Sequence, residues 1–337
     1  MNNSEKYSSF ALVKEMLETV DVVKKFDPIC SAKFVNPLLS KKGLFLTGEG
    51  SSRIFPAKNT IYESLKSGGL IPIFTEGATQ SLEYQLDDFV VFGASNSGRT
   101  KEVVRLFSKL KERGHENIFS LTANNNTILE ELSADSHILN FGKEDAVAAT
   151  KSVIEQALFY DSLLRNDAGI EMTSLNDLAQ NIKNALSIEI DPELVNMMQN
   201  ADMIYFGGRN TGVVEELALK TNEITRKKSD FLEGTYAVHG IEEVMDKNEL
   251  LIIVEPFESE EEKFRECLID GVGMEVVAIS SRETSFPTIK IPDGGQYKTY
   301  VELAGGWNVL VEIGLALGID LDKPVRARKV GNEYIIK

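Results

Sequence analysis

Two turns rich in serine and glycine carry side chains that could bind an anion. One covers residues 48–53, and the other covers 93–100 and leads into a helical pattern that begins at Lys101. A turn of this kind between a strand and a helix aims backbone N–H groups and the positive helix end at one point. We predict a phosphate-sized site, with a helix cap and ordinary turn serines as the alternative. The side chains that would line it are Ser51, Ser52, Ser95, Asn96, Ser97 and Thr100.

The spacing within the second turn narrows the choice of ligand. Residues 93–100 match neither the phosphate loop of nucleoside triphosphatases nor the glycine pattern of dinucleotide-binding folds. The corresponding place in the second half of the chain, residues 254–258, is acidic, and the only hydroxyl nearby is that of Ser259. We therefore expect only the first half to bind phosphate at this position.

A stripe of charged residues in the segment 213–226 could transfer protons. At about 100° per residue, Glu216, Lys220 and Glu223 fall on one face of a helix. Apolar side chains flank this stripe, while the other polar residues of the segment lie on the opposite arc. A partly buried carboxylate beside an ammonium group suits acid–base catalysis. The alternative is an exposed Glu–Lys pair that only supports the helix.

No residue cluster predicts a metal ion or an organic cofactor, and we expect neither. Cys30 and Cys267 are far apart and lack metal-ligand spacing, which also excludes a disulfide framework and favours a reducing compartment. His239 follows a turn-like segment, and a lone histidine is more often structural than catalytic. His115 and His137 are assigned no role.

Short apolar runs alternate with helical patterns along the chain. Such runs predict strands covered on both faces, and the alternation predicts a parallel α/β sheet. The order repeats after about 160 residues, because runs near 43, 88 and 119 recur near 203, 249 and 277. We predict two tandem α/β units, each a five-stranded parallel sheet flanked by helices. The expected parts are a helical lead at 1–40, a first unit at 41–166, a helical linker at 167–198 and a second unit with an active-site tail at 199–337.

Composition excludes several classes of function. The 337 residues include 36 Lys and Arg against 52 Asp and Glu, a formal net charge of −16. Because no basic tract could neutralise phosphates, we expect no binding to nucleic acid or to an anionic membrane surface. The sequence has neither an apolar signal core nor a run of about 18 apolar residues, so we expect a cytoplasmic protein.

Six segments together resemble the double sugar-isomerase (SIS) domain family of phosphosugar isomerases. The resemblance covers nearly the whole chain from about residue 40, and above all it is to the isomerase half of glutamine–fructose-6-phosphate aminotransferase. The similar segments are 50–52 (family C-G-T-S), 95–100 (S-Q-S-G-E-T), 144–151 (E-x-x-V-A-S-T-K), 216–224 (E-G-A-L-K-L-K-E-I), 238–240 (K-H-G) and 322–329 (D-x-P-R-N-L-A-K).

The resemblance implies a small-molecule sugar phosphate as ligand and a role for each candidate residue. Glu223 would shuttle a proton between C1 and C2, with Lys220 and Glu216 in support. His239 would help to open the sugar ring in the neighbouring subunit of a homodimer, and Lys329 would form a Schiff base with the ketose. The phosphate would be bound by Ser95, Asn96, Ser97 and Thr100, and the sugar would lie near Ser51, Ser52 and Val147.

The implied activity is that of a phosphosugar isomerase or an aminosugar-phosphate deaminase-isomerase in amino sugar metabolism. Its substrate would be a hexose 6-phosphate such as glucosamine 6-phosphate or fructose 6-phosphate. The alternatives are a deglycase of a phosphorylated amine–sugar adduct, a non-catalytic sugar-phosphate sensor and an ether-cleaving sugar-acid enzyme, which usually has a single SIS domain. No glutaminase part with a cysteine nucleophile is visible, so we expect no ammonia transfer from glutamine.

The chain departs from the family pattern at several positions. Ala149 stands where the family has a serine that contacts the sugar, so that contact is lost. Val238 and Ile241 replace a lysine and a proline around the histidine. The tail has Val325 and Arg326 where the family has R-N, and this affects the register onto the Schiff-base lysine.

Overall fold

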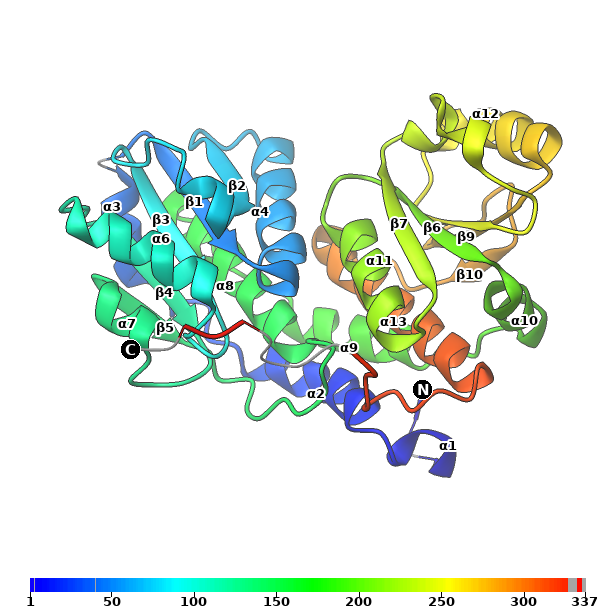
Figure 1. The fold of residues 1–337 in the computed structure, drawn as a ribbon, viewed down its shortest axis with the longest axis horizontal. Coiled ribbons are helices and arrows are strands. Elements are labelled where there is room, and N and C mark those ends of the chain that lie inside the picture. Colours follow the sequence, from blue (N-terminus) through cyan, green and yellow to red (C-terminus); the bar gives the residue numbers. More distant parts are fainter. Residues whose placement is uncertain (3, 40, 327–331, 335–337) are drawn as a thin grey trace. The chain divides into compact units, whose positions relative to one another are not determined.

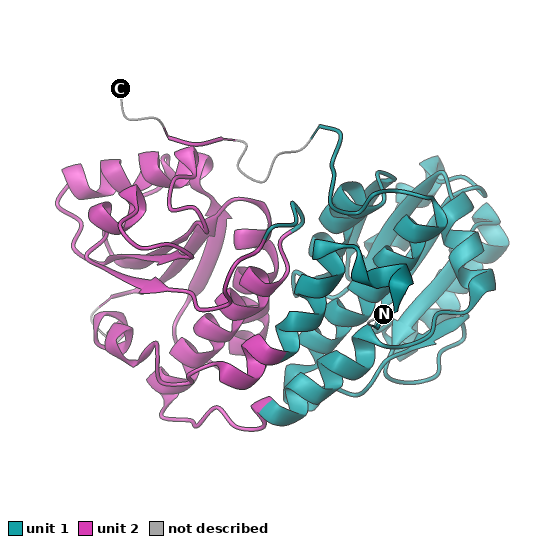
Figure 2. Ribbon diagram, turned by 90° about the horizontal axis from the view of Figure 1, so that it is seen from below, with its two compact units in different colours: residues 1–20, 145–148, 176–327 teal, residues 21–144, 149–175, 328–337 magenta. Residues whose placement is uncertain are grey.

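The chain forms two compact α/β units (Figures 1 and 2). The computed structural model describes residues 1–2, 4–39, 41–326 and 332–334. Unit 1 comprises residues 1–20, 145–148 and 176–327, and unit 2 comprises 21–144, 149–175 and 328–337. Each unit contains one five-stranded sheet in which neighbouring strands run parallel. This confirms the predicted fold class of two tandem parallel units.

Unit 2 is built on the sheet β2-β1-β3-β4-β5, with α3, α4 and α8 on one face and α5, α6 and α7 on the other. Its strands are β1 (Gly43–Gly48), β2 (Ile73–Gly77), β3 (Phe89–Ala94), β4 (Ile118–Thr122) and β5 (Asp135–Ile138). Its helices are α3 (Val35–Leu39), α4 (Ile54–Lys66), α5 (Ala78–Ser81), α6 (Lys101–Glu112), α7 (Ile128–Leu132) and α8 (Lys151–Ala168), with short turns η1 (Ala32–Phe34) and η2 (Gly50–Ser52).

Side-chain alternation along the strands of unit 2 produces two apolar cores. Leu44 and Phe92 point into one core with Phe159 of α8, whereas Phe45 and Val91 point into the other with α6. Because both faces are covered by helices, the inner strands β1, β3 and β4 are buried almost throughout and lack the alternation of a half-exposed sheet.

Unit 1 repeats the same strand order as β7-β6-β8-β9-β10. Its strands are β6 (Met203–Gly208), β7 (Lys228–Glu233), β8 (Leu250–Val254), β9 (Glu275–Ser280) and β10 (Thr288–Lys290). Its helices are α1 (Glu5–Ser8), the first part of α2 (Ala11–Lys25), most of α9 (Leu175–Leu186), α10 (Pro192–Asn200), α11 (Val213–Ile224), α12 (Glu261–Phe264) and α13 (Lys298–Ala316). Short helical turns complete it: η3 (Tyr236–Val238), η4 (Ile241–Val244), η5 (Glu258–Glu260), η6 (Arg265–Val272) and η7 (Gly295–Tyr297).

The last helix of unit 2, α8, begins at Lys151, directly after a turn. The buried Glu144 carboxylate accepts hydrogen bonds from Thr150 N–H (2.8 Å) and from the Ser152 hydroxyl (2.9 Å). A carboxylate at this place satisfies the free N–H groups of a first helical turn and suits the helix dipole. Residues before Thr150 are therefore held as a turn, and they do not extend α8.

Candidate active site

The turn after β3 encloses a buried serine. The Ser95 hydroxyl lies 2.8 Å from the Thr100 hydroxyl and accepts Thr100 N–H at 3.3 Å, while Gly98 N–H donates to Ser95 O at 2.9 Å. Gly98 has a φ of 62°, and a Cβ there would overlap the Thr127 side chain, so both backbone and space require glycine. The result is a tight loop that ends at the first turn of α6.

Asn96 and Ser97 form the outer part of this loop. The Asn96 carbonyl accepts hydrogen bonds from Ala123 N–H and from the Asn124 side-chain amide, each at 3.0 Å. The Ser97 hydroxyl accepts Arg99 N–H at 3.2 Å. Loop 95–100 is thereby fixed to the end of β4, and its polar groups are held at the carboxyl edge of the sheet.

The other serine turn lies beside the first one. Ser51 and Ser52 belong to η2, directly after β1, and β1 pairs with β3. A Cβ on Gly48 would lie 3.0 Å from Ser52 O and 3.1 Å from Ala94 O, so the two strand ends approach each other closely there. The structure thus brings both serine turns to the same edge of one sheet, which is where parallel sheets bind ligands.

Val147 does not belong to the unit that carries this loop cluster. Val147 is partly exposed in the segment 145–148, which groups with unit 1. There the Glu15 carboxylate accepts the N–H groups of Asp145 and Ala146. Lys329 lies outside the described residues.

The described residues 332–334 lie beside loop 95–100 within unit 2; this loop is called the anion loop below. Asn332 O accepts Lys101 N–H at 3.0 Å, and Tyr334 N–H donates to Arg99 O at 2.8 Å. The Asn332 amide also donates to the Glu102 carboxylate. The first N–H group of α6 is therefore bonded to the tail.

The charged stripe of unit 1 is a buried ion cluster on α11. Lys220 is fully buried, and its Nζ lies 3.3 Å from Glu216 Oε1 and 2.8 Å from Glu223 Oε2. Burial alone would lower the pKa of Lys220, but the two carboxylates outweigh it and raise the pKa above its ordinary value. Glu216 is fully buried, whereas 23% of the Glu223 side chain is exposed. Glu223 is thus the member of the stripe that a ligand could reach.

Close packing against α13 positions this stripe. α11 contacts both α13 and β7. A Cβ on Gly306 of α13 would overlap the buried Leu217 side chain, which lies between Glu216 and Ala218 on α11. Glycine at 306 therefore allows the two helices to approach closely.

His239 lies at the end of η3 and is exposed. Its backbone N–H donates to Tyr236 O at 3.1 Å. Within the described part of the chain, no hydrogen bond joins its imidazole to the stripe on α11. The structure of one chain therefore does not bring His239 together with Glu223.

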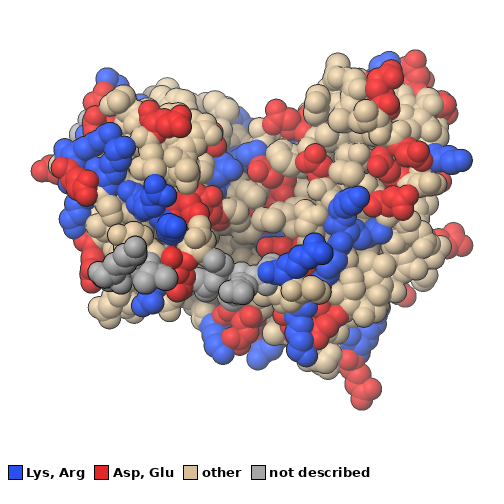
Figure 3. All heavy atoms as spheres, in the orientation of Figure 1, with Lys and Arg blue, Asp and Glu red and all other residues tan. Residues whose placement is uncertain are grey.

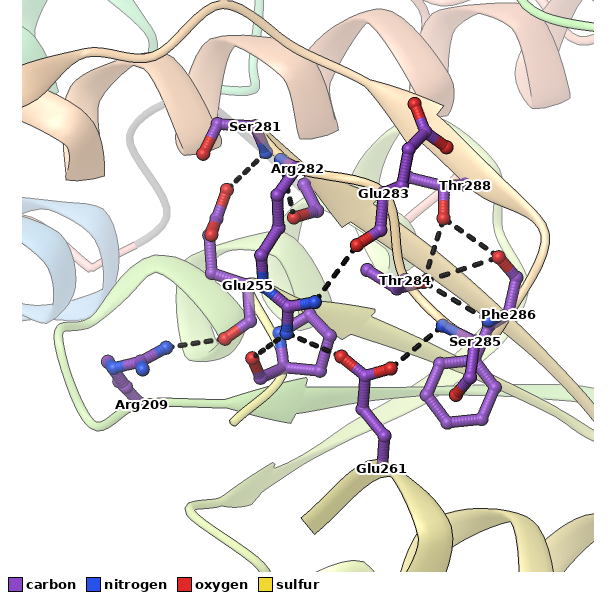
Figure 4. A network of polar contacts seen from close by, with 12 residues as sticks. Arg209, Glu255, Glu261, Ser281, Arg282, Glu283, Thr284, Ser285, Phe286 and Thr288 are labelled. Carbon is purple, nitrogen blue, oxygen red and sulfur yellow. Dashed lines mark hydrogen bonds and ion pairs between the residues drawn. The ribbon is translucent and has the colours of Figure 1, made fainter. Parts of the chain in front are cut away.

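The place in unit 1 that corresponds to the anion loop is filled by the chain's own side chains (Figure 4). Glu255, which follows β8 with a φ of 47°, accepts Ser281 N–H with its carboxylate. Glu261 accepts Ser285 N–H at 2.7 Å and pairs with the Arg282 guanidinium. Arg209 donates to Glu255 O, and its guanidinium stacks on the Phe257 ring at 4.1 Å. Acidic side chains that are already hydrogen-bonded within the chain thus follow β8 in unit 1.

Three further observations concern metal ligands, surface charge and membrane-spanning helices. Among the described residues, no group of three or more His, Cys, Asp and Glu side chains could hold a metal ion. On the face drawn in Figure 3, acidic and basic side chains are interspersed over each unit. No described helix is long and apolar enough to cross a membrane.

Sequence reasoning missed two polar residues of α8 and its preceding turn. Glu144 was matched to the family pattern without a role, and it caps α8. Gln156 was not singled out, and its amide donates to Asn96 Oδ1 at 2.9 Å. The available signal was the polar pair Glu155 and Gln156 between the apolar residues 153–154 and 157–159.

Comparison with known proteins supports the same fold. Residues 38–165 match the model of the SIS domain family. No curated protein matches the sequence significantly. The C-terminal domain of glucosamine-fructose-6-phosphate aminotransferase from Francisella tularensis is 18% identical at a TM-score of 0.76, and the alignment covers 95% of this chain and 100% of that one.

Two further solved structures are similar over nearly the whole chain. Tagatose-6-phosphate ketose/aldose isomerase from Escherichia coli is 18% identical at a TM-score of 0.76, covering 95% of this chain and 98% of that one. Glucosamine-6-phosphate deaminase from Thermotoga maritima is 19% identical at a TM-score of 0.71, covering 94% and 98%. Residues 38–165 therefore match the SIS domain family, and the chain has, over both units, the fold of these solved structures.

Proposed function

We propose that the protein is a phosphosugar isomerase or aminosugar-phosphate deaminase-isomerase that acts on a hexose 6-phosphate. The observation that carries the proposal is the ion cluster on α11, in which a fully buried ammonium holds a partly exposed carboxylate. Burying two carboxylates and an ammonium costs folding free energy, and a helix that needed only support would use apolar residues there. A positioned carboxylate is what proton transfer beside a carbonyl requires.

In the proposed reaction, Glu223 removes the proton from C2 of the open-chain aldose and returns it to C1. Lys220 holds the Glu223 carboxylate in position through its 2.8 Å contact, and Glu216 shares the ammonium charge. Loop 95–100, together with Ser51 and Ser52, binds the phosphate and the adjoining sugar. Lys329 forms the Schiff base with the ketose, and Val147 contacts the sugar.

The exposed His239 fits a role in a neighbouring subunit. We propose that the chain is a homodimer in which His239 opens the sugar ring in its neighbour's site. Its imidazole is exposed at the end of η3. Analytical ultracentrifugation tests this, because a chain that sediments as a monomer at working concentration contradicts it.

The test is ammonia release from glucosamine 6-phosphate, with fructose 6-phosphate followed in parallel. Glu223→Gln removes the charge of the carboxylate and keeps its shape. We expect turnover to fall about 10²- to 10⁴-fold, the usual contribution of a general base, with sugar-phosphate binding retained. Glu193→Gln, the same change at an exposed position of α10, should leave turnover unchanged.

The outcomes separate the alternatives. Unchanged turnover in Glu223→Gln would remove Glu223 from the reaction. If the unmodified protein binds glucosamine 6-phosphate and releases no ammonia, two alternatives remain. Either its substrate is a different phosphorylated compound, such as an amine–sugar adduct, or the protein is a non-catalytic sensor. If it does not bind the sugar phosphate at all, the proposal is wrong.

A further inference from the structure

Loop 95–100 is joined to α8 by a pair of side-chain amides. Gln156 Nε2 donates to Asn96 Oδ1 at 2.9 Å. Gln156 is fully buried in α8, next to the buried Glu155 and near the apolar Ile154, Ala157 and Phe159, which are fully buried as well. An apolar side chain at this position would pack without desolvating an amide. Burial of the Gln156 amide therefore costs folding free energy, and packing of the core does not explain why an amide stands at this position.

The Gln156 amide is only half satisfied. Its Oε1 is buried and has no hydrogen-bond partner among the described residues. If the amide were turned over, Oε1 would face Asn96 and the NH₂ group would be left without a partner. An unpaired buried carbonyl oxygen is tolerated better than an unpaired buried N–H group. The observed orientation, with Gln156 as donor, is thus the favourable one.

We propose that Gln156 is a positioning residue that sets the polarity of the anion loop. An Asn side chain has one accepting and one donating end. By holding Oδ1 of Asn96, Gln156 leaves the Nδ2 amino group as the end turned away from α8. The Asn96 backbone is fixed independently by Ala123 and Asn124. The side-chain amide of Asn96 can still rotate, and its orientation decides whether a phosphate meets a hydrogen-bond donor or an acceptor.

This inference rests on the proposed function in one respect, namely that loop 95–100 binds the phosphate. Gln156→Glu tests it because a carboxylate has the same shape and can only accept. The Asn96 amide must then turn its Nδ2 toward residue 156 and present Oδ1 to the phosphate. We expect the dissociation constant for glucosamine 6-phosphate, measured by calorimetry on the full chain, to rise about 10- to 100-fold.

Binding measured over a range of pH distinguishes a reversed Asn96 amide from a general loss of loop structure in Gln156→Glu. Protonating the new carboxyl restores an O–H donor to Asn96 Oδ1, and burial raises the pKa of such a carboxyl. The affinity ratio between unmodified protein and Gln156→Glu should therefore shrink as the pH falls. The matched control is Gln180→Glu, because Gln180 Nε2 donates to Asn184 Oδ1 at 2.7 Å in the same way on the exposed face of α9. It should bind like the unmodified protein at every pH.

Each outcome decides the question. If the unmodified protein binds and Gln156→Glu binds equally well, the inference is wrong and the proposed function stands. A loss of affinity that does not depend on pH also overturns the polarity argument. If Gln156→Glu does not fold, Gln156→Met replaces it, with a smaller loss of affinity expected and none overturning the inference. If the unmodified protein binds no sugar phosphate, both the proposed function and the inference fail.

Discussion

The buried Lys220 and the partly buried His137 show how surroundings decide the charge of a basic side chain. Lys220 keeps its proton, because Glu216 and Glu223 outweigh the effect of burial on its pKa. His137 stays neutral, because burial, with a smaller effect of Lys33, lowers its pKa to about 4. Its imidazole stacks on Phe159 at 4.7 Å. Loss of water around the side chain disfavours the charge of both, yet only the lysine has anionic neighbours strong enough to keep it charged.

The depressed pKa of His137 predicts that stability depends on pH. The unfolded chain binds this proton near pH 6.5, whereas the folded chain binds it only near pH 4. Stability from the neutral imidazole is therefore complete above about pH 6.5 and falls as the pH drops toward 4, by up to about 3 kcal/mol. We expect His137→Phe, which keeps the stacked ring, to lose less stability than the unmodified protein between pH 7 and pH 5 in urea unfolding. Equal losses would contradict this assignment.

Much of the residue-level site is visible in the sequence, and the rest depends on the fold. Helical periodicity alone places Glu216, Lys220 and Glu223 on one face, because that face is a local property. The partnership of Gln156 with Asn96 joins residues 60 positions apart. Such a contact follows from which helix covers which strand end, and no spacing rule reveals it.

At the scale of elements, the approach of α11 to α13 depends on one glycine. In an isolated helix, alanine is about 1 kcal/mol more favourable than glycine. At Gly306, however, the added Cβ would meet Leu217. Overpacking of this kind costs about 1–3 kcal/mol, so the clash should outweigh the gain in helix propensity.

Gly306→Ala should therefore destabilise the protein and lower turnover, because it displaces the helix that carries Glu223. Leu217→Ala removes the obstacle, so Gly306→Ala should cost less in that background. Thermal unfolding of the two single variants and the double variant measures this coupling. Additive losses would show that the two helices do not meet at this point.

Helix starts were harder to predict than strand order. Apolar runs and their repeat indicate both sheets, because burial on two faces leaves a continuous signal. The start of α8 depends on the buried Glu144 cap, and the apolar pattern before Thr150 gives no sign of it. A single residue also marks the start of a strand: β2 begins at Ile73, directly after Pro72, which has no N–H to donate.

At the scale of the whole molecule, the two units have one topology and different strand ends. Loop 95–100 of unit 2 has serine hydroxyls at the sheet edge, whereas Glu255 and Glu261 fill the matching place in unit 1. The sequence indicates this difference by its acidic segment. It does not reveal that Arg282 and backbone N–H groups bind those carboxylates.

We therefore expect one phosphate ester to bind per chain, not two. Calorimetric titration with glucosamine 6-phosphate should give a stoichiometry of one. Ser97→Ala should weaken this binding, because it removes a hydroxyl that accepts Arg99 N–H and shapes the loop. Ser259→Ala removes the hydroxyl that follows β8 in unit 1 and should have no effect. A second binding event that Ser259→Ala abolishes would contradict the expectation that this segment binds no phosphate.

The N-terminus of α2 is capped from the other end of the sequence. Ala11 N–H and Leu12 N–H donate to the two carboxylate oxygens of Asp322, at 2.7 and 2.9 Å. On the ribosome, this helix start is synthesised more than 300 residues before the aspartate that caps it. Residues 21–175 supply nearly all of unit 2 before then. Since domains fold as they leave the ribosome, unit 2 can form first, and unit 1 is completed only after Asp322 has been synthesised.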